Sequence, residues 1–568
     1  MKKIIYGESN FRKIKINNDY LYIDKTNYIE TLEKSNESFF IFLRPRRFGK
    51  SLFLSTLQYY YDENSTHEFD SIFYDTYIGQ HPTPLKNSYK ILFFEFSGIN
   101  TDGGMDIIYE GFKDNIKSAI YRYFTKYNYN ISRESLNTIE TPTGLIKYFF
   151  DVIENDKIFL LIDEYDQFAN AILAHSMQDF LQIVSKGGFV RSFYEVLKTA
   201  TLSGTVQKMF ITGVTPITLD SLSSGFNIVK HITYKKEFNA LAGFTDEEVK
   251  YSLIESIFKK CPEIDKEALL EKVKIWYNGY LFNEEAEERI YNSTLVNYFI
   301  TEYNFNKCTM PNRMLDSNVA SDYKVIMKLF NIGNSDKNFQ ILQELIENNA
   351  VIGEIKDRYD LNQEFSRDDF ITLIYSMGFI TIKNETFGGE FEFEIPNYVI
   401  KMLYFNYFVI ELKNRNNLKM DRDIKTILRD LALGDEKAFQ NQLEEVIKTL
   451  SNRDHMGFDE KYFQVITLSL LSFADFYFID SQPEKNRKYP DILLIGRDNK
   501  VPNNYLFELK WIKSKDNYAI VKKEGIKQVE GYLKLDKVKN IPKLRSFLLI
   551  GSKDGVEFLE VKKTPLKN

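Results

Sequence analysis

The segment RPRRFGKS, residues 44–51, combines residue types that can bind a nucleotide phosphate. Gly49 lets the backbone approach a phosphate closely, Lys50 can reach the β- and γ-phosphates, and the Ser51 hydroxyl can bind Mg²⁺. The apolar run 39–43 precedes the segment and a helix-like stretch follows it, which is the order that a phosphate-binding loop requires. We therefore expect the whole loop to contact ATP: Arg44, Pro45, Arg46, Arg47, Phe48, Gly49, Lys50 and Ser51.

The loop departs from the pattern GxxxxGK[ST] at its first position, where Arg44 replaces glycine. An isolated GKS is common in proteins, and the run RPRR also fits an exposed basic loop. Pro45 restricts the backbone beside it. The match is therefore partial, and the interpretation depends on further residues.

A second polar group follows the apolar run 158–162. Asp163 at the end of this predicted strand can supply a carboxylate to the Mg²⁺ site, and Glu164 can orient or deprotonate the attacking water. Asp166 can add negative charge there. The next apolar run ends at Thr212, and the hydroxyl of either Thr212 or Thr215 can sense the γ-phosphate. An apolar strand that ends in Asp-Glu is common by itself, but the segments in this order predict a nucleotide site.

A separate set of charged residues lies near the C-terminus, where Asp491 is followed by Glu508, Leu509 and Lys510. Glu508 and Lys510 are two residues apart on a predicted strand, so their side chains point to one face. A hairpin would return Glu508 beside Asp491. The two carboxylates and the Leu509 carbonyl can then bind Mg²⁺ or Mn²⁺, while Lys510 can position water or stabilise charge on an attacked phosphate. The alternative is a salt-bridged strand without metal.

The surroundings of this set are basic, although the whole chain has a net charge of −6. Residues 481–535 contain 12 Lys or Arg and 7 Asp or Glu. Such a patch attracts a phosphate backbone, and we expect Lys488 and Lys513 to contact nucleic acid. A solvated lysine-rich face is the alternative interpretation, and sequence-specific recognition has no support in the pattern.

The elements that must position these residues differ along the chain. Strand-like runs alternate with helix-like stretches in the first part, at 39–43, 91–96, 158–162 and 209–212. This alternation is typical of a parallel sheet covered by helices. The pattern then becomes mostly helical, with a helix at 368–377 and a small hairpin at 379–395. The last part again mixes helices with strands around a mostly antiparallel hairpin core.

We therefore expect an α/β protein of three domains. Residues 1–245 form a P-loop parallel-sheet ATPase domain, residues 246–430 a helical or winged-helix-like middle region, and residues 431–568 an α/β domain like a restriction endonuclease. The polar run 413–422 is the expected linker to the last domain.

Composition limits the classes of function. Lys and Arg total 74 against 80 Asp and Glu, so the chain is not a wholly basic nucleic-acid binder. The two cysteines, Cys261 and Cys308, cannot build a disulfide scaffold or a four-cysteine zinc site, and they suit thiols of a reducing cytoplasm. The most apolar long stretch, 465–479, is shorter than the roughly 20 residues of a membrane span. We expect a cytoplasmic protein without a membrane contact.

Several longer motifs resemble the bacterial AAA-ATPase-like family: IDKTNYI at 23–29, FLRPRRFGKSLFLSTL at 42–57, LLIDEYDQ at 160–167, FYEVLK at 193–198, FITGVTP at 210–216, GFTDEEV at 243–249 and WYNGYLF at 276–282. The resemblance implies that RPRRFGKS is the usual form of the loop in this family. The arginine at position 44 is then weaker evidence against a phosphate-binding loop. The resemblance also implies ATP binding and a C-terminal domain similar to the PD-(D/E)XK nucleases.

The nuclease resemblance implies roles for three further residues. Glu460 on the preceding predicted helix corresponds to an extra acidic metal ligand. Gln528 and Tyr532 match the QxxxY helix of one branch of the superfamily, which implies a place near nucleic acid, although Tyr532 also fits a core position.

These patterns predict an ATP-binding and ATP-hydrolysing protein with a Mg²⁺-dependent nuclease domain that acts on nucleic acid, with DNA favoured. A homo-oligomer is compatible with this interpretation. The alternative is a nucleotide-dependent switch whose C-terminal domain binds nucleic acid without cleaving it.

Overall fold

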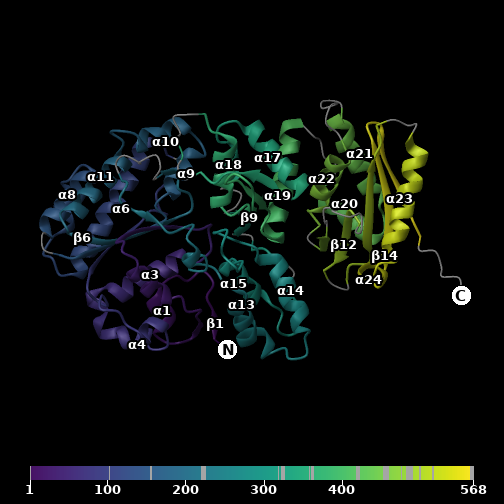
Figure 1. Cartoon of the computed structure of the whole chain (residues 1–568). Coiled ribbons are helices and arrows are strands. Elements are labelled where there is room, and N and C mark those ends of the chain that lie inside the picture. Colours follow the sequence, from purple (N-terminus) through teal and green to yellow (C-terminus); the bar gives the residue numbers. More distant parts are fainter. Residues whose placement is uncertain are drawn as a thin grey trace. The chain divides into compact units, whose positions relative to one another are not determined.

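The computed structural model of the chain (Figure 1) describes residues 2–101, 103–153, 156–218, 226–311, 313–316, 319–321, 327–356, 359, 364–416, 423–451, 459–474, 476–480, 490–497, 500–513 and 517–562. The chain forms two compact units. The first unit contains Met1–Ile341 and Ile352–Tyr398, and the second contains Leu342–Val351 and Val399–Asn568. The division into three domains stays a prediction, since its boundaries at 245 and 430 fall inside these units.

The first unit contains a sheet of five parallel strands in the order β4-β5-β6-β3-β7. The strands are β3 Phe39–Leu43, β4 Lys90–Glu95, β5 Ile158–Asp163, β6 Val206–Gly213 and β7 Lys230–His231. Every residue of β5 is buried, as expected for a central strand with helices on both faces. The predicted parallel sheet is confirmed, and β7 is an addition to the four expected strands.

The main helices of this sheet are α3 Lys50–Tyr61, α6 Met105–Lys126, α8 Pro142–Val152 and α11 Phe189–Leu202. Helices α6, α8 and α11 pack on one another, while α3 packs against β5 and β6 (Figure 1). Because all five strands are parallel, their carboxyl ends lie at one edge of the sheet. This edge carries the loop after β3, the polar residues after β5 and the end of β6.

The rest of the first unit is mostly helical. Helix α13 Asp246–Leu253 begins with a capping box in which the Thr245 and Glu248 side chains bind each other's backbone N–H groups. Helix α18 Arg367–Ser376 leads into the antiparallel hairpin of β9 Thr381–Glu385 and β10 Phe391–Glu394. The predicted helix and hairpin are therefore confirmed.

The structure has further described elements between residues 2 and 353. They are β1 Lys3–Ile4, α1 Phe11–Lys15, β2 Tyr20–Leu21, α2 Asn27–Lys34, η1 Glu63–Glu68, α4 Phe69–Phe73, α5 Tyr77–Gln80, α7 Arg133–Asn137, α9 Gln167–Leu173, α10 Met177–Val184, η2 Lys236–Phe238, the π-helix η3 Ile254–Phe258, α14 Lys266–Tyr277, α15 Ser293–Glu302, η4 Met327–Asn331, α17 Ser335–Asn348 and β8 Val351–Gly353.

The second unit contains a mixed sheet in the order β11-β12-β13-β14-β15. Its strands are β11 Tyr477–Asp480, β12 Ile492–Gly496, β13 Asn504–Trp511, β14 Leu544–Ser552 and β15 Gly555–Glu560. Neighbouring strands are antiparallel except β13 and β14, which are parallel. Helix α23 Tyr518–Tyr532 connects this parallel pair, because parallel strands need a crossover.

The other helices of the C-terminal part are α19 Tyr398–Asn416, α20 Ile424–Leu433, α21 Lys437–Ser451, α22 Glu460–Leu471 and α24 Asp536–Lys539. The predicted linker begins inside α19, since 413–416 are helical, and its residues 417–422 lie outside the described part. No helix in the described ranges is long and apolar enough to cross a membrane.

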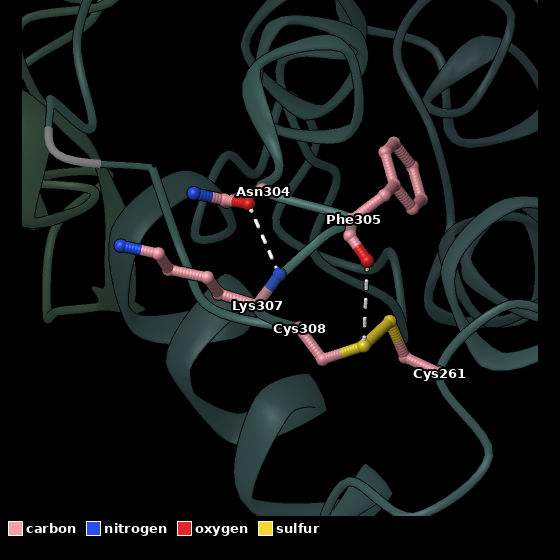
Figure 2. Close-up of a disulfide and its surroundings, with 5 residues drawn as sticks. All are labelled: Cys261, Asn304, Phe305, Lys307 and Cys308. Carbon is pink, nitrogen blue, oxygen red and sulfur yellow. Dashed lines mark hydrogen bonds between the residues drawn. A yellow bond between two sulfur atoms is a disulfide. The ribbon is translucent and has the colours of Figure 1, made fainter.

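The two cysteines differ from the sequence expectation, which took them as thiols. Cys261 and Cys308 form a disulfide across 47 positions of the chain (Figure 2). Cys261 follows the π-helix and donates its N–H to Ile257 O at 2.8 Å, while Cys308 lies in the turn closed by Lys307 N and Asn304 Oδ1 at 3.1 Å. Folding brings the two turns together, which neither local sequence indicates.

Candidate nucleotide and nuclease sites

The loop between β3 and α3 forms one wall of a cavity of about 420 Å³ in the first unit. Its backbone turns through the left-handed region at Arg47, with φ +70°, and at Gly49, with φ +97°. Glycine adopts this conformation without strain. Because α3 begins at Lys50, the partial positive charge of its N-terminus lies at the same place. Loop and helix together favour an anion.

Lys50 is the buried cation of this wall. Its Nζ donates to the carbonyl oxygens of Arg44 at 2.9 Å and Pro45 at 3.1 Å. Burial lowers the pKa of Lys50, although the nearby carboxylates of Glu164 and Asp163 oppose that effect. A phosphate would give the ammonium group a counter-charge that the two carbonyl oxygens do not supply.

The Arg44 side chain is buried and holds the loop against neighbouring segments. Its guanidinium lies between the rings of Phe42 and Phe282, at 4.4 and 3.9 Å from their centroids. It donates to the carbonyl oxygens of Thr233 at 2.7 Å and Phe238 at 2.9 Å, and burial lowers its pKa to about 9. Arg44 does not have a positive φ, so the missing glycine costs the loop nothing there. The side chain anchors the loop and points away from the phosphate position.

The opposite side of the loop is held by segments that are distant in sequence. Gly243, with φ +87°, donates its N–H to Phe48 O at 2.8 Å, and a Cβ there would lie 2.9 Å from the Phe48 ring. The cavity is completed by residues of segments 5–9, 21–25, 241–244 and 293–297. The side chain of Asn297 fixes this wall by donating to Ile5 O at 2.8 Å.

Asp163 and Thr212 lie side by side at the ends of β5 and β6. Both are buried, and the Thr212 hydroxyl donates to Asp163 Oδ1. The same oxygen accepts from the backbone N–H of Glu164 at 3.0 Å. Asp163 is therefore oriented by two donors, and the Thr212 hydroxyl contacts this carboxylate.

Glu164 itself faces the cavity. Its backbone is left-handed, with φ +49°, which a non-glycine residue adopts rarely and which often marks a functional position. Burial raises its pKa, and the charges of Lys50 and Arg46 lower it in part. A carboxylate with a raised pKa is a better proton acceptor for water.

Asp166 fastens the loop after β6. Its carboxylate accepts from the N–H groups of Val214 at 3.1 Å and Thr215 at 2.7 Å, and from Asn170 Nδ2 at 2.7 Å. Gly213 makes this possible, because a Cβ there would lie 2.4 Å from Asp166 Oδ1. From the sequence, Asp166 is expected only to add negative charge at the site, and its hydrogen bonds to the loop after β6 are a further finding.

The structure thus brings most of the predicted nucleotide residues to one cavity. Its wall contains Arg46, Arg47, Phe48, Gly49, Lys50, Ser51 and Glu164. Arg44, Pro45, Asp163 and Thr212 lie behind this wall. The facing segments were not predicted, although two of them overlap the motifs IDKTNYI and GFTDEEV on which the family resemblance rests.

The second unit places Asp491 and Glu508 on neighbouring strands. The β12–β13 register pairs Ile492 with Phe507, so the next pair outward is Asp491 and Glu508. Asp491 Oδ2 accepts from the N–H of Leu509 at 2.7 Å. Burial raises the pKa of Asp491 well above its usual range, and the charge of Glu508 raises it further. A half-buried carboxylate whose charge is disfavoured by the buried carboxylate beside it is suited to a cation that both can bind.

Lys510 lies beside this pair. Its Nζ is 2.8 Å from Glu508 Oε1 and 3.3 Å from Glu460 Oε1. Burial alone would lower the pKa of Lys510, but the carboxylates of Glu508, Glu460 and Asp491 outweigh it and raise that pKa. The lysine is therefore a cation at a site with more acidic than basic groups.

These residues fit a hard divalent cation in part. Asp491 and Glu508 can supply carboxylate oxygens, and Leu509, the next residue of β13, can supply its carbonyl oxygen. Mg²⁺ is often bound by one or two carboxylates, with water in its other coordination positions. Within the described ranges, no three His, Cys, Asp or Glu side chains converge on one point. Glu460 is exposed on α22, whereas Asp491 and Glu508 are adjacent on neighbouring strands, so this pair is the better candidate for the metal.

The expected nucleic-acid contacts are more scattered. Lys488 lies outside the described residues, and Lys513 is exposed after β13. Gln528 Oε1 is buried and has no hydrogen-bond partner in the described part of the chain. Tyr532 is 4% exposed and packs in a hydrophobic cluster with Leu506 and Leu548, which favours the core interpretation.

Two family models match different parts of the chain. Residues 5–223 match the family model AAA-ATPase-like, described as a predicted AAA-ATPase, and residues 458–554 match that of the PD-(D/E)XK nuclease superfamily. An uncharacterised protein in the vnfD 5′ region of Azotobacter chroococcum mcd 1 is 26% identical over 292 residues, 50% of this chain and 50% of that protein. The chain thus spans about half the length of this relative. The two family matches confirm the predicted resemblances.

Proposed function

We propose that the protein binds and hydrolyses ATP in its first unit and cleaves nucleic acid, with DNA favoured, in a Mg²⁺-dependent reaction in its second unit. The observation that carries the nuclease part is the pair Asp491 and Glu508. They lie on adjacent strands beside Lys510, and the pKa of Asp491 is raised by burial and by Glu508. Repulsion between the two carboxylates does not stabilise the fold.

The residues of the second unit have distinct roles in this proposal. Asp491, Glu508 and the Leu509 carbonyl would hold the cation, which supplies charge stabilisation at the phosphate and a more acidic bound water. Lys510 stabilises the negative charge that develops on the attacked phosphate. Mn²⁺ can replace Mg²⁺, since both accept oxygen ligands.

In the first unit, Lys50 binds the β- and γ-phosphates, and Ser51 and Asp163 would hold the Mg²⁺ of ATP. Glu164 accepts the proton of the attacking water. Its raised pKa and its place in the cavity wall support this role.

The test is incubation of the protein with labelled DNA and RNA, with and without ATP, in EDTA, Mg²⁺ or Mn²⁺. We expect metal-dependent cleavage of DNA, and none by Lys510→Ala. The matched control is Lys527→Ala, an exposed lysine of α23. If the wild-type protein cleaves neither nucleic acid under any of these conditions, the nuclease part is wrong.

A nucleotide-dependent switch is the second candidate. It is favoured by the ion pairs of Lys510 with Glu508 and Glu460, which give the lysine partners without any metal. This candidate predicts retention of labelled DNA by the wild-type protein, sensitive to ATP, with the strand intact after incubation with Mg²⁺.

The further parts of the proposal concern partners and location. We infer nucleic acid as the partner of the second unit, and a homo-oligomer stays compatible with the first. A cytoplasmic location stays a prediction. The disulfide between Cys261 and Cys308 is evidence against this prediction, since disulfides are rare in a reducing cytosol.

A further inference from the structure

The three arginines of the loop 44–51 have different surroundings. The Arg44 guanidinium is buried against backbone carbonyl groups, as described above. Arg47 lies near Tyr6, where its charge lowers the pKa of the phenol against the stronger effect of burial. Arg46 is half-buried, and its side chain has no ion pair or hydrogen bond within the described ranges. Among the three arginines of the loop, Arg46 is therefore the one whose guanidinium can bind a ligand without breaking another side-chain contact.

Arg46 stands between two cavities. It lines the nucleotide cavity of about 420 Å³ and also a second cavity of about 160 Å³. Glu164 and Gln167 line both cavities as well. Arg46 and Glu164 therefore share the boundary at which the nucleotide cavity ends.

The charge of Arg46 acts on both groups that mark the γ-phosphate. It lowers the pKa of Lys50 and that of Glu164, in each case after the larger effect of burial. Lys50 binds the γ-phosphate and Glu164 faces the attacking water. A cation close to both is close to the phosphoryl group that is transferred.

The backbone keeps Arg46 at this place. Its carbonyl oxygen accepts from Asn292 Nδ2 at 3.3 Å, and the next carbonyl, of Arg47, accepts from Thr294 N at 3.3 Å. The loop is thus fixed by the start of α15, while the Arg46 guanidinium stays available to a ligand.

We propose that Arg46 is a catalytic residue which binds the γ-phosphate in cis, so that one chain completes its own site without an arginine from a second copy. This inference rests on the proposed ATP hydrolysis. Water attacks the γ-phosphorus and gives a proton to Glu164, the bond from phosphorus to the β-phosphate oxygen breaks, and ADP leaves with that electron pair. Arg46 stabilises the negative charge on the transferring group, a contribution of about 10³-fold or more in similar enzymes.

The first experiment measures binding to Arg46→Ala by calorimetry, with ADP·Mg²⁺ and with ADP·Mg²⁺ plus aluminium fluoride, which imitates the transferring phosphoryl group. We expect ADP affinity within about threefold of wild type and at least a tenfold loss for the fluoroaluminate complex. Arg46→Lys should recover part of the loss, because lysine keeps the charge but not the planar fork. Equal affinities of Arg46→Ala and wild type for the fluoroaluminate complex overturn the proposal.

The second experiment separates action in cis from action in trans. Arg46→Ala is mixed with Lys50→Ala, which lacks the phosphate-binding lysine but keeps Arg46. We expect no recovery of hydrolysis in the mixture, and recovery would overturn the assignment in cis. The control Arg133→Ala, an exposed arginine of α7, should hydrolyse ATP at the wild-type rate.

The two proposals fail in different ways. If wild type binds ADP with fluoroaluminate but does not hydrolyse ATP, the hydrolysis part of the proposed function is wrong. The selective loss of fluoroaluminate affinity in Arg46→Ala still supports the contact of Arg46 with the γ-phosphate position in that case.

Discussion

At the two candidate sites, burial disfavours the charge of groups of opposite sign. At the nucleotide site, Lys50 is held by carbonyl oxygens and burial lowers its pKa. At the second site, Asp491 lies opposite Glu508, and burial raises its pKa. The first site thus disfavours the positive charge of Lys50, and the second disfavours the negative charge of Asp491. The ligand that we propose for each site has the opposite charge and would stabilise the ionised group.

The comparison shows how a site can be told from an ordinary ion pair. A structural ion pair satisfies both partners, and neither charge gains from a further ligand. In our proposal an anion completes the first site and a cation completes the second. The following predictions test that difference.

The largest effect would come from removing a carboxylate at the second site. Asp491→Asn or Glu508→Gln should abolish DNA cleavage, a loss of at least about 10³-fold, since metal-ion catalysis contributes several kcal/mol. The measurement is plasmid nicking in Mg²⁺. Glu530→Gln, an exposed residue of α23, is the matched control. If either variant cleaved DNA at the wild-type rate, the carboxylate that it lacks would not be a ligand of a catalytic metal.

At the nucleotide site, Glu164→Gln should retain ATP binding and lose at least about 10²-fold in turnover, because the amide cannot accept the proton of water. Phosphate release and calorimetry measure the two properties separately. Glu134→Gln on α7 serves as the control, since this side chain is exposed. Unchanged phosphate release would show that another group activates the water.

A smaller effect is expected for the buried cation. Lys50→Ala should weaken ATP binding at least about tenfold, or about 1.4 kcal/mol, through loss of a charge-assisted contact. Titration calorimetry of ATP is compared with Lys147→Ala, an exposed lysine of α8. A folded Lys50→Ala protein with wild-type affinity would contradict the assignment.

The smallest effect concerns stability and pH. The native pKa of Asp491 lies above its usual range, so wild type loses stability as pH rises from about 4 to that raised pKa, by about 1.4 kcal/mol for each unit of displacement. Asp491→Asn removes this loss. In EDTA the variant should therefore become increasingly more stable than wild type across that interval.

Mg²⁺ should reverse the order, since only wild type gains the ligand. Thermal unfolding from pH 4 to 8, in EDTA and in Mg²⁺, makes the comparison. Glu508→Gln is expected to behave differently and to lose stability in EDTA, because Glu508 is bound to Lys510. If both variants lose stability and Mg²⁺ has no effect, the ion-pair interpretation is correct.

Much of the fold could be predicted because its signals are local. The buried strand β5 is an unbroken apolar run, and the helix after Thr245 begins with a recognisable capping box. Asp491 and Glu508 were expected to meet because a hairpin between two apolar runs has few possible registers. Their roles, and that of Glu164, stay predictions.

The remaining features depend on contacts that leave no local pattern. Arg44 looked like a defect of the loop, yet its partners are the carbonyl oxygens of Thr233 and Phe238, about 190 residues away. Backbone carbonyl groups have no sequence signature, so this anchor could not be read from the chain. The same reason hid the wall of segments 5–9 and 293–297 and the pairing of Cys261 with Cys308.

The division of the chain into units has a consequence for inheritance. Leu342–Val351 belongs to the second unit, although the stretches on both sides of it belong to the first. A recombination event with one breakpoint between the units would leave this decapeptide behind. Exchange of the C-terminal part between genes is therefore expected to be better tolerated when this upstream segment changes with it. The two activities that we propose are expected to be inherited as a pair.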